Sequence, residues 1–146
     1  MKLKMLYADD EPINLSHFAM FFRDDFEVLT ALNPEEAMAH VARHNDIAIT
    51  VSDQRMYGMT GVQLLDKIRE KLPHTVSIIF SAYNITEDMV EAINGGRIMT
   101  CMLKPWRMDR LQQIVGQARE IYLTERHLKR QMLRAVPERV ASSPCP

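Results

Sequence analysis

Short apolar runs alternate with amphipathic segments along most of the 146-residue chain, and this alternation constrains the fold more than any other feature. Each apolar run is a predicted strand, and each segment between runs repeats its apolar residues near the 3.6-residue period of a helix. Strand–helix alternation is typical of a parallel sheet covered by helices on both faces. The sequence therefore predicts an α/β, doubly wound, five-stranded sheet with strands at 4–8, 26–30, 47–52, 75–80 and 98–103.

Cap and breaker residues indicate where the predicted helices begin and end. Asn33-Pro34 supplies a capping side chain followed by a proline in the first turn. Gly95-Gly96 suits a helix C-terminus. Pro137 is predicted to end the last helix. The predicted helices span 12–23, 33–44, 62–72, 86–94 and 107–136.

Composition narrows the classes of protein that this chain can represent. A net charge of −1 gives no overall case for nucleic-acid binding. We expect no secretory signal and no membrane span, because acidic residues follow the N-terminus closely and no run approaches ~18 apolar residues. Two cysteines, Cys101 and Cys145, form no disulfide framework, so we expect a cytoplasmic protein.

Polar side chains follow four of the predicted strands at the point where each strand ends. They are Asp9 and Asp10, Asp53, Ser81, and Lys104, which precedes Pro105. Sites in open α/β sheets form outside the carboxyl ends of the strands, so we expect these groups to lie together. The sequence leaves open whether the Lys104–Pro105 bond is cis.

These residue types together can hold a divalent cation and a phosphoryl group. Adjacent Asp9 and Asp10 favour a neutralising cation, although they would also suit two loop acids that cap a helix. Asp53 could attack a phosphoryl donor to form an acyl phosphate, or it could be a turn residue. Ser81 could donate to a phosphoryl oxygen, and Lys104 could pair with phosphate or with the carboxylates.

The motifs together resemble the receiver domain of two-component response regulators over about residues 2–120. The resemblance implies a flavodoxin-like (CheY-like) sheet of order 2-1-3-4-5. The Lys-Pro-Trp segment is similar to a subgroup often joined to cyclic-dinucleotide phosphodiesterase or other signalling outputs. The segments that carry the resemblance are Tyr-Ala-Asp9-Asp10-Glu11, Val-Ser-Asp53-Gln-Arg-Met, Gly-Met-Thr-Gly61, Ile-Ile-Phe-Ser81-Ala and Leu-Lys104-Pro105-Trp106.

The resemblance implies a role for each site residue. Asp53 would accept a phosphoryl group from a sensor histidine kinase or a phosphotransfer protein. Asp10, Asp53 and the backbone carbonyl of Arg55 would coordinate Mg²⁺, with Asp9 acting mainly through water. Ser81 and Lys104 would hold the phosphoryl oxygens. The chain would then be a switch with no enzymatic turnover beyond its own phosphorylation and dephosphorylation.

Two residues depart from the family pattern. Tyr57 stands where the family usually has proline, and its ring could loosen the loop or lie beside the site. Cys101 stands where the family commonly has Tyr or Phe, whose ring moves inward when the Ser or Thr engages phosphate. A thiol packs as a small hydrophobe. The usual aromatic relay from the site is therefore in doubt.

The last predicted helix is longer than a receiver requires. Its apolar residues recur at alternating three- and four-residue steps, which suggests a homodimeric coiled coil, with a helix that folds back on its own domain or frays as the alternative. We expect a receiver domain at 1–120, a helical extension at 121–137 and a disordered tail at 138–146. No helix-turn-helix pattern is visible, so we expect no direct DNA binding. The repeat comprises Leu111, Ile114, Ala118, Ile121, Leu128, Met132 and Ala135, and Glu125 interrupts it between Ile121 and Leu128.

Two rival functions use the same residues. A constitutive dimerisation or scaffold module would carry a silent acidic site, and Tyr57 and Cys101 favour it. A phosphatase with an aspartyl nucleophile would normally need a second acid two residues after Asp53, where Arg55 stands.

Overall fold

A five-stranded parallel sheet forms the centre of the molecule, as a computed structural model describes it for residues 2–142. The strand order is β2-β1-β3-β4-β5, which confirms the predicted fold and topology. The central strand β3 is buried along its whole length, as the apolar residues on both of its faces predicted. The strands are β1 (Leu3–Ala8), β2 (Phe26–Ala31), β3 (Ile47–Asp53), β4 (Val76–Ser81) and β5 (Thr100–Leu103).

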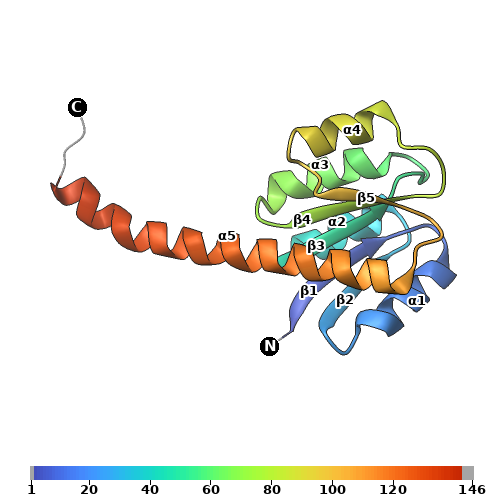
Figure 1. Cartoon of the computed structure of the whole chain (residues 1–146), viewed down its shortest axis with the longest axis horizontal. Coiled ribbons are helices and arrows are strands. Elements are labelled where there is room, and N and C mark those ends of the chain that lie inside the picture. Colours follow the sequence, from blue (N-terminus) through green and yellow to red (C-terminus); the bar gives the residue numbers. More distant parts are fainter. Residues whose placement is uncertain (1, 143–146) are drawn as a thin grey trace.

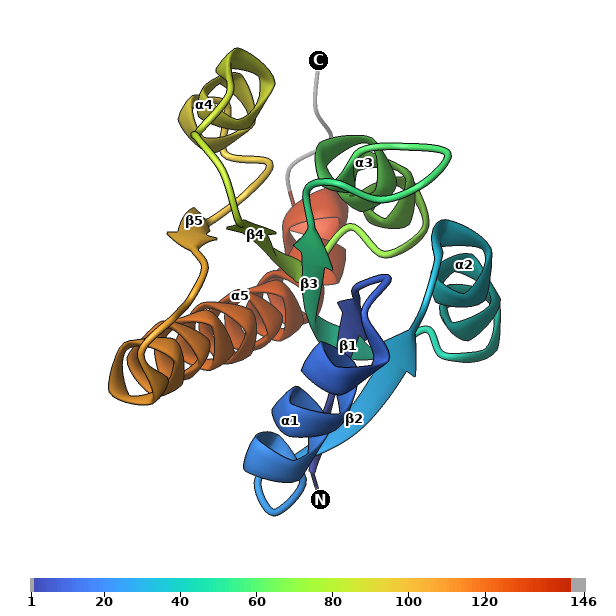
Figure 2. The ribbon, with the colours of Figure 1, turned by 90° about the vertical axis from the view of Figure 1, so that its right-hand side faces the viewer.

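Five helices cover the two faces of the sheet (Figure 2). Helices α1 and α5 pack on one face through a core of aromatic and aliphatic side chains that includes Phe18 and Phe80. Helices α2, α3 and α4 lie on the other face, over two smaller apolar clusters. The helices are α1 (Pro12–Phe22), α2 (Pro34–Arg43), α3 (Gly61–Lys71), α4 (Glu87–Asn94) and α5 (Met108–Ser142).

Local signals in the sequence set most of the helix boundaries. The Asn33 side chain accepts a hydrogen bond from the Glu36 backbone at 2.8 Å, as predicted for a capping residue. Thr60 and Gln63 form a reciprocal capping box at the start of α3. Gly96 follows α4 with a φ of 75°, a conformation that glycine adopts without strain.

Strand register brings the predicted site residues to one edge of the sheet. Ala8 pairs with Ser52, so Asp9 and Asp53 follow neighbouring strands at the same level. Asp53 pairs with Phe80, directly before Ser81, and Ser81 pairs with Leu103, directly before Lys104. Parallel pairing without a register slip at this edge therefore places four strand ends side by side.

Helix α5 has two halves with different surroundings. Its first half covers the sheet, with Leu111 and Tyr122 among its buried residues. The second half extends beyond the sheet, at the end opposite to the carboxyl ends of the strands (Figure 1). Leu128 and Met132 in this half are 51% and 65% exposed. The first half of the predicted seam therefore packs within its own domain, and the proposed pairing of the outer half stays a prediction.

The predicted end of α5 at Pro137 is wrong, because the helix runs to Ser142. A proline inside a helix removes one backbone hydrogen bond, and the turns on either side can keep theirs. Residues 138–142 of the predicted tail are therefore helical, and residues 143–146 lie outside the described residues. Within residues 2–142, no helix has both the length and the apolar character needed to cross a membrane.

Candidate functional site

Three carboxylates meet at the carboxyl edge of the sheet. One oxygen from each of Asp9, Asp10 and Asp53 lies within 4.8 Å of the others. Asp9 and Asp53 are buried, whereas Asp10 is exposed at the start of the β1–α1 connection. Like charges this close repel one another, so the cluster requires a cation to remain ionised.

Lys104 supplies a positive charge to this cluster from the end of β5. Its Nζ donates to Asp9 Oδ2 at 2.9 Å and lies 3.2 Å from Asp53 Oδ1. The Lys104 side chain is 15% exposed, so solvent screens these contacts weakly. The Lys104–Pro105 peptide bond is cis, which answers the question that the sequence left open. The Lys104 backbone also donates to the Ser81 carbonyl at 2.7 Å.

Donors surround Asp9 on both of its oxygens. Oδ2 accepts from the Tyr7 hydroxyl, from Lys104 and from Asn14 Nδ2 at 3.1 Å, and Oδ1 accepts from the Glu11 backbone at 3.0 Å. These bonds fix the carboxylate and fully engage Oδ2, while Oδ1 accepts a single bond. Asp9 is therefore poorly placed to coordinate a cation directly, whereas the exposed Asp10 is free of such packing.

The pKa values of the two buried carboxyls move in opposite directions. Burial raises the pKa of Asp53, and Asp9 and Asp10 add to this effect, while Lys104 opposes it. Burial also disfavours the charged form of Asp9, but hydrogen bonds from Tyr7 and Lys104 hold its pKa below the usual value. Burial would lower the pKa of Lys104, but the hydrogen bond with Asp9 and the charge of Asp53 raise it, so Lys104 stays cationic.

The backbone of Gly61, at the start of α3, packs closely against the backbone of Asp53. A Cβ atom on Gly61 would lie 2.4 Å from the Asp53 carbonyl oxygen and 2.9 Å from Ile79 Cδ1. Only glycine therefore lets the start of α3 approach the strand end this closely. The contact positions the Asp53 main chain through the packing of α3 on β3.

Ser81 is buried beside the carboxylate cluster but bonds within its own loop. Its hydroxyl donates to the Tyr83 carbonyl at 3.4 Å and accepts from the Tyr83 backbone N–H at 3.3 Å. The exposed ring of Tyr83 lies 4.5 Å from the Arg55 guanidinium, an arrangement typical of a cation–π contact. The β3–α3 and β4–α4 loops thus meet through Arg55 and Tyr83 at the rim of the site.

Sequence reasoning missed four residues that shape this site. Tyr7 and Asn14 hold Asp9, Tyr83 holds the Ser81 hydroxyl, and the Gln54 side chain bonds to two helices. Strand alternation could have found Tyr7, since residues two apart on a strand face the same side. The sequence carries no comparable signal for Gln54 or Tyr83, because their partners come from other loops.

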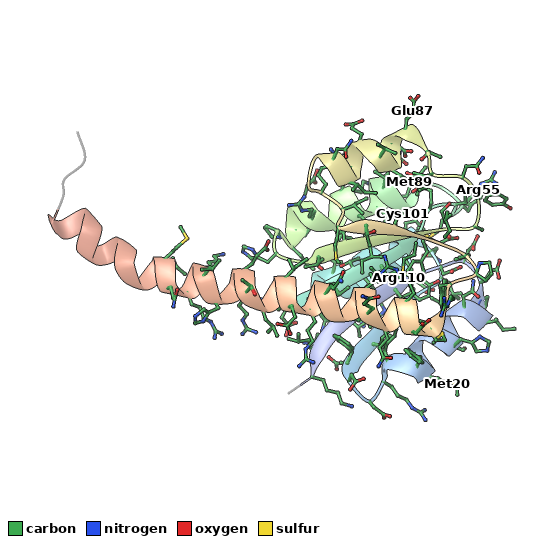
Figure 3. All side chains as sticks on the ribbon, in the orientation of Figure 1. Met20, Arg55, Glu87, Met89, Cys101 and Arg110 are labelled. Carbon is green, nitrogen blue, oxygen red and sulfur yellow. The ribbon has the colours of Figure 1, made fainter. Side chains whose placement is uncertain are left out.

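The two departures from the family pattern have different structural outcomes. Tyr57 is 95% exposed, so its ring points into solvent and does not cover the carboxylates. Cys101 on β5 packs against the apolar cluster beneath α4, beside Met89 (Figure 3). Burial raises the pKa of its thiol, which favours the unreactive protonated form. Cys101 therefore behaves as a small packing residue.

An all-oxygen cluster of this kind fits a hard divalent cation. Carboxylate and carbonyl oxygens are the donors that Mg²⁺ selects, and Mg²⁺ usually keeps several waters and takes phosphate oxygens as further ligands. The exposed Asp10 leaves one side of the cluster open for such ligands. The donor set present is thus compatible with the predicted metal.

Comparison with known proteins places the chain in a family. The family model of the response regulator receiver domain matches residues 5–116. The hydrogenase transcriptional regulatory protein HoxA from Cupriavidus necator is 36% identical over 116 residues, covering 80% of this chain and 24% of its own. NtrX from Brucella abortus superimposes with a TM-score of 0.78 and 26% identity, over 98% of this chain and 35% of that chain.

A further solved structure supports the fold. An adenylate cyclase structure from Rhodopirellula baltica matches with a TM-score of 0.84 and 24% identity, over 92% of this chain and 98% of that chain. The chain belongs to the receiver domains of response regulators, the phosphoacceptor modules of two-component signalling. It spans about a quarter of the length of the curated relatives it matches. The predicted Lys-Pro-Trp subgroup stays a prediction.

Proposed function

We propose that Asp53 accepts a phosphoryl group from the phosphohistidine of a sensor histidine kinase or a phosphotransfer protein, in a Mg²⁺-dependent phosphorelay. The position of Lys104 carries this proposal. Its Nζ lies 3.2 Å from Asp53 Oδ1 and is held there by Asp9 at 2.9 Å. A cation fixed beside the acceptor oxygen can neutralise charge on an incoming phosphoryl group without rearranging.

The chemical step is an in-line displacement at phosphorus. An Asp53 carboxylate oxygen forms the new P–O bond while the P–N bond of the donor phosphohistidine breaks, and the imidazole nitrogen keeps the electron pair. The raised pKa of Asp53 reflects a crowded carboxylate, and Lys104 keeps it ionised as a nucleophile near neutral pH. The product is an acyl phosphate on Asp53.

The acidic cluster assigns separate roles to its members. Asp10, Asp53 and the Arg55 backbone carbonyl would hold Mg²⁺, and Asp9 would act through water because each of its oxygens already accepts a hydrogen bond and Oδ2 accepts three. When bound, Mg²⁺ supplies charge neutralisation for the phosphoryl oxygens. Asp9 then has a second role, since it orients the Lys104 ammonium toward Asp53.

Ser81 completes the site only after a local rearrangement. Its hydroxyl is engaged with Tyr83, so it must exchange these two bonds for one to a phosphoryl oxygen. Both bonds are long, at 3.4 and 3.3 Å, and a charged acceptor makes a stronger hydrogen bond than a neutral one. Phosphorylation would therefore draw the start of the β4–α4 loop toward Asp53.

A mass measurement tests the proposal directly. The chain is incubated with Mg²⁺ and acetyl phosphate, and the intact mass is recorded. We expect an adduct of about 80 Da, the mass of a phosphoryl group, which is absent from Asp53→Asn. Asp24→Asn is the matched control, because Asp24 is an exposed aspartate away from the site. An adduct that persists in Asp53→Asn would contradict the assignment of the acceptor.

The same measurement separates the rival functions. A scaffold module with a silent site forms no adduct, and a phosphatase releases phosphate rapidly without accumulating one. Our proposal of a switch without further enzymatic activity expects accumulation followed by slow loss. Omission of Mg²⁺ should reduce adduct formation by about 100-fold or more, because the carboxylates then repel the donor.

We further propose that the outer half of α5 pairs with a second copy of the chain. Leu128 and Met132 are four residues apart and largely exposed, as expected for a coiled-coil seam without its partner. A size measurement that finds only monomer at high concentration would contradict this proposal.

We also propose that the protein is cytoplasmic, since Cys101 is a free thiol.

A further inference from the structure

Gln54, the residue directly after the proposed acceptor, connects three elements of the fold. Its side chain is buried, with Oε1 accepting from the Val62 backbone at 3.0 Å and Nε2 donating to Asp88 Oδ2 at 3.2 Å. Its backbone N–H donates to the Phe80 carbonyl at 2.8 Å. Gln54 thus ties the end of β3 to β4 and to the first turns of α3 and α4.

Helix α4 is held differently at its two ends. Near its C-terminus, Arg97 pairs with Asp66 of α3 at 3.1 Å and reaches Glu91 at 3.7 Å. At its N-terminus, Asp88 is exposed and receives the Gln54 hydrogen bond. The helix has eight residues, of which Met89 and Ala92 are buried, so its apolar contact with the rest of the domain is small. Such a helix can pivot about its C-terminal end when the N-terminal contact opens.

The proposed chemistry acts on both sides of this N-terminal contact. Asp53 is bonded covalently to Gln54, and a shift of Ser81 toward the phosphoryl group moves the loop that leads into Asp88. Cys101 has no aromatic ring to carry the change along β5. The Gln54–Asp88 hydrogen bond is therefore the contact that spans from the acceptor to α4 (Figure 3 labels Glu87, the neighbour of Asp88, at the start of α4).

We propose that Gln54 is a positioning residue that couples phosphorylation of Asp53 to helix α4. The Gln54–Asp88 hydrogen bond is intact in the unphosphorylated protein and opens when Asp53 carries a phosphoryl group, which releases the N-terminus of α4. This inference rests on the proposed phosphoacceptor function of Asp53.

Hydrogen exchange followed by mass spectrometry tests the coupling in the full chain. With Mg²⁺ present, adding acetyl phosphate should speed exchange of the α4 amides from Val90 onward, the first that are hydrogen-bonded within the helix, about fivefold in the parent protein. This is the factor expected for one modest hydrogen bond. In Asp88→Ala the exchange should already be fast before acetyl phosphate is added, and the ratio should approach one. Asp88→Asn keeps an acceptor oxygen and should retain most of the parent response.

Two control variants isolate the contact with Gln54. Glu87→Ala removes a carboxylate from the same helical turn but leaves the Gln54 contact in place. Thr86→Ala removes the Thr86–Asp88 hydrogen bond, which Asp88→Ala also loses. Both controls should respond to acetyl phosphate as the parent does. A loss of response in either control would assign the effect to the helix start and overturn the role of Gln54.

Binding of beryllofluoride with Mg²⁺ gives a second readout that a merely structural role would not move. Coupling is reciprocal for equilibrium binding, so removing a contact present only in the free state should tighten beryllofluoride binding by the same factor, about fivefold in Asp88→Ala. Unchanged or weaker binding would overturn the coupling. Failure of the parent to form an adduct would instead overturn the proposed function, and the coupling with it.

Discussion

The carboxylate cluster and the outer half of α5 differ in how far a single chain completes them. At the cluster, Asp9 and Asp53 are buried, and Lys104 contacts both. Along the outer half of α5, Leu128 and Met132 lie 51% and 65% exposed, at the opposite end of the sheet (Figure 1). The buried carboxylates receive a counter-charge from Lys104 of the same chain. The apolar side chains of the outer helix stay exposed to solvent. The first region is therefore complete within the domain, and the second exposes the apolar residues that we propose to bind a second copy of the chain.

The largest expected effect tests how tightly the site is built. Gly61→Ala should destabilise the fold by about 3 kcal/mol, because the new Cβ meets the Asp53 carbonyl, which cannot move away as a flexible side chain would. Gly116→Ala in α5 is the matched control, since a Cβ there meets nothing within 4 Å. It should stabilise the helix by about 0.5–1 kcal/mol. Urea unfolding measures both, and equal effects would show that Gly61 is no more tightly packed than Gly116.

The next effect concerns the buried cation. Lys104→Met should lower the free energy of unfolding by about 2 kcal/mol in metal-free buffer, because two buried carboxylates lose their counter-charge. Added Mg²⁺ should recover part of this loss. Lys67→Met, on the exposed face of α3, is the control and should change stability by less than about 0.5 kcal/mol. If the Lys104 variant has the same free energy of unfolding as the parent, Lys104 does not stabilise the carboxylate cluster.

The two buried carboxyls should respond oppositely to pH. The folded state raises the pKa of Asp53, so this residue favours the fold as pH falls through the raised value and disfavours it when ionised. The folded state lowers the pKa of Asp9, so its contribution is present above the usual value and is lost as pH falls through the lowered one. At pH 7, Asp53→Asn should therefore stabilise by about 1 kcal/mol and Asp9→Asn should destabilise by at least as much.

Unfolding curves recorded at several pH values measure this difference. The gain in Asp53→Asn should disappear on acidification, since the parent Asp53 is then protonated as well. Two variants that shift stability in the same direction at pH 7 would contradict the opposite pKa shifts, which arise from burial at Asp53 and from the donors Tyr7 and Lys104 at Asp9.

The smallest effect on stability is expected at the outer helix. Leu128→Lys should change the free energy of unfolding of the monomer by less than about 0.5 kcal/mol, because the side chain is exposed. The same change should abolish the proposed dimer in a light-scattering measurement and leave adduct formation on Asp53 intact. Arg126→Ala, on the same exposed stretch, is the control. A dimer that survives Leu128→Lys would place the interface elsewhere.

Particular residues show how far sequence reasoning reached. The apolar pattern of residues 47–52 was sufficient to predict a central strand. The polar residues that follow the strands were sufficient to predict which carboxylates lie together. The end of α5 was predicted wrongly, because Pro137 is a strong local signal that the helix overrides. The seam on α5 was misread in part, since periodicity cannot distinguish a face that covers its own sheet from one that meets a partner.

By itself, the sequence determined the order of strands and helices, the helix caps and the kinds of chemical group at the edge of the sheet. These depend on local periodicity, on cap residues and on the rule that parallel strands end together. The tertiary structure alone decided that Asp9 is enclosed by donors while Asp10 stays open, and that Gln54 reaches Asp88 across 34 residues of chain. Such contacts join loops from different strands, so their partners are set by packing in three dimensions and leave no pattern along the chain.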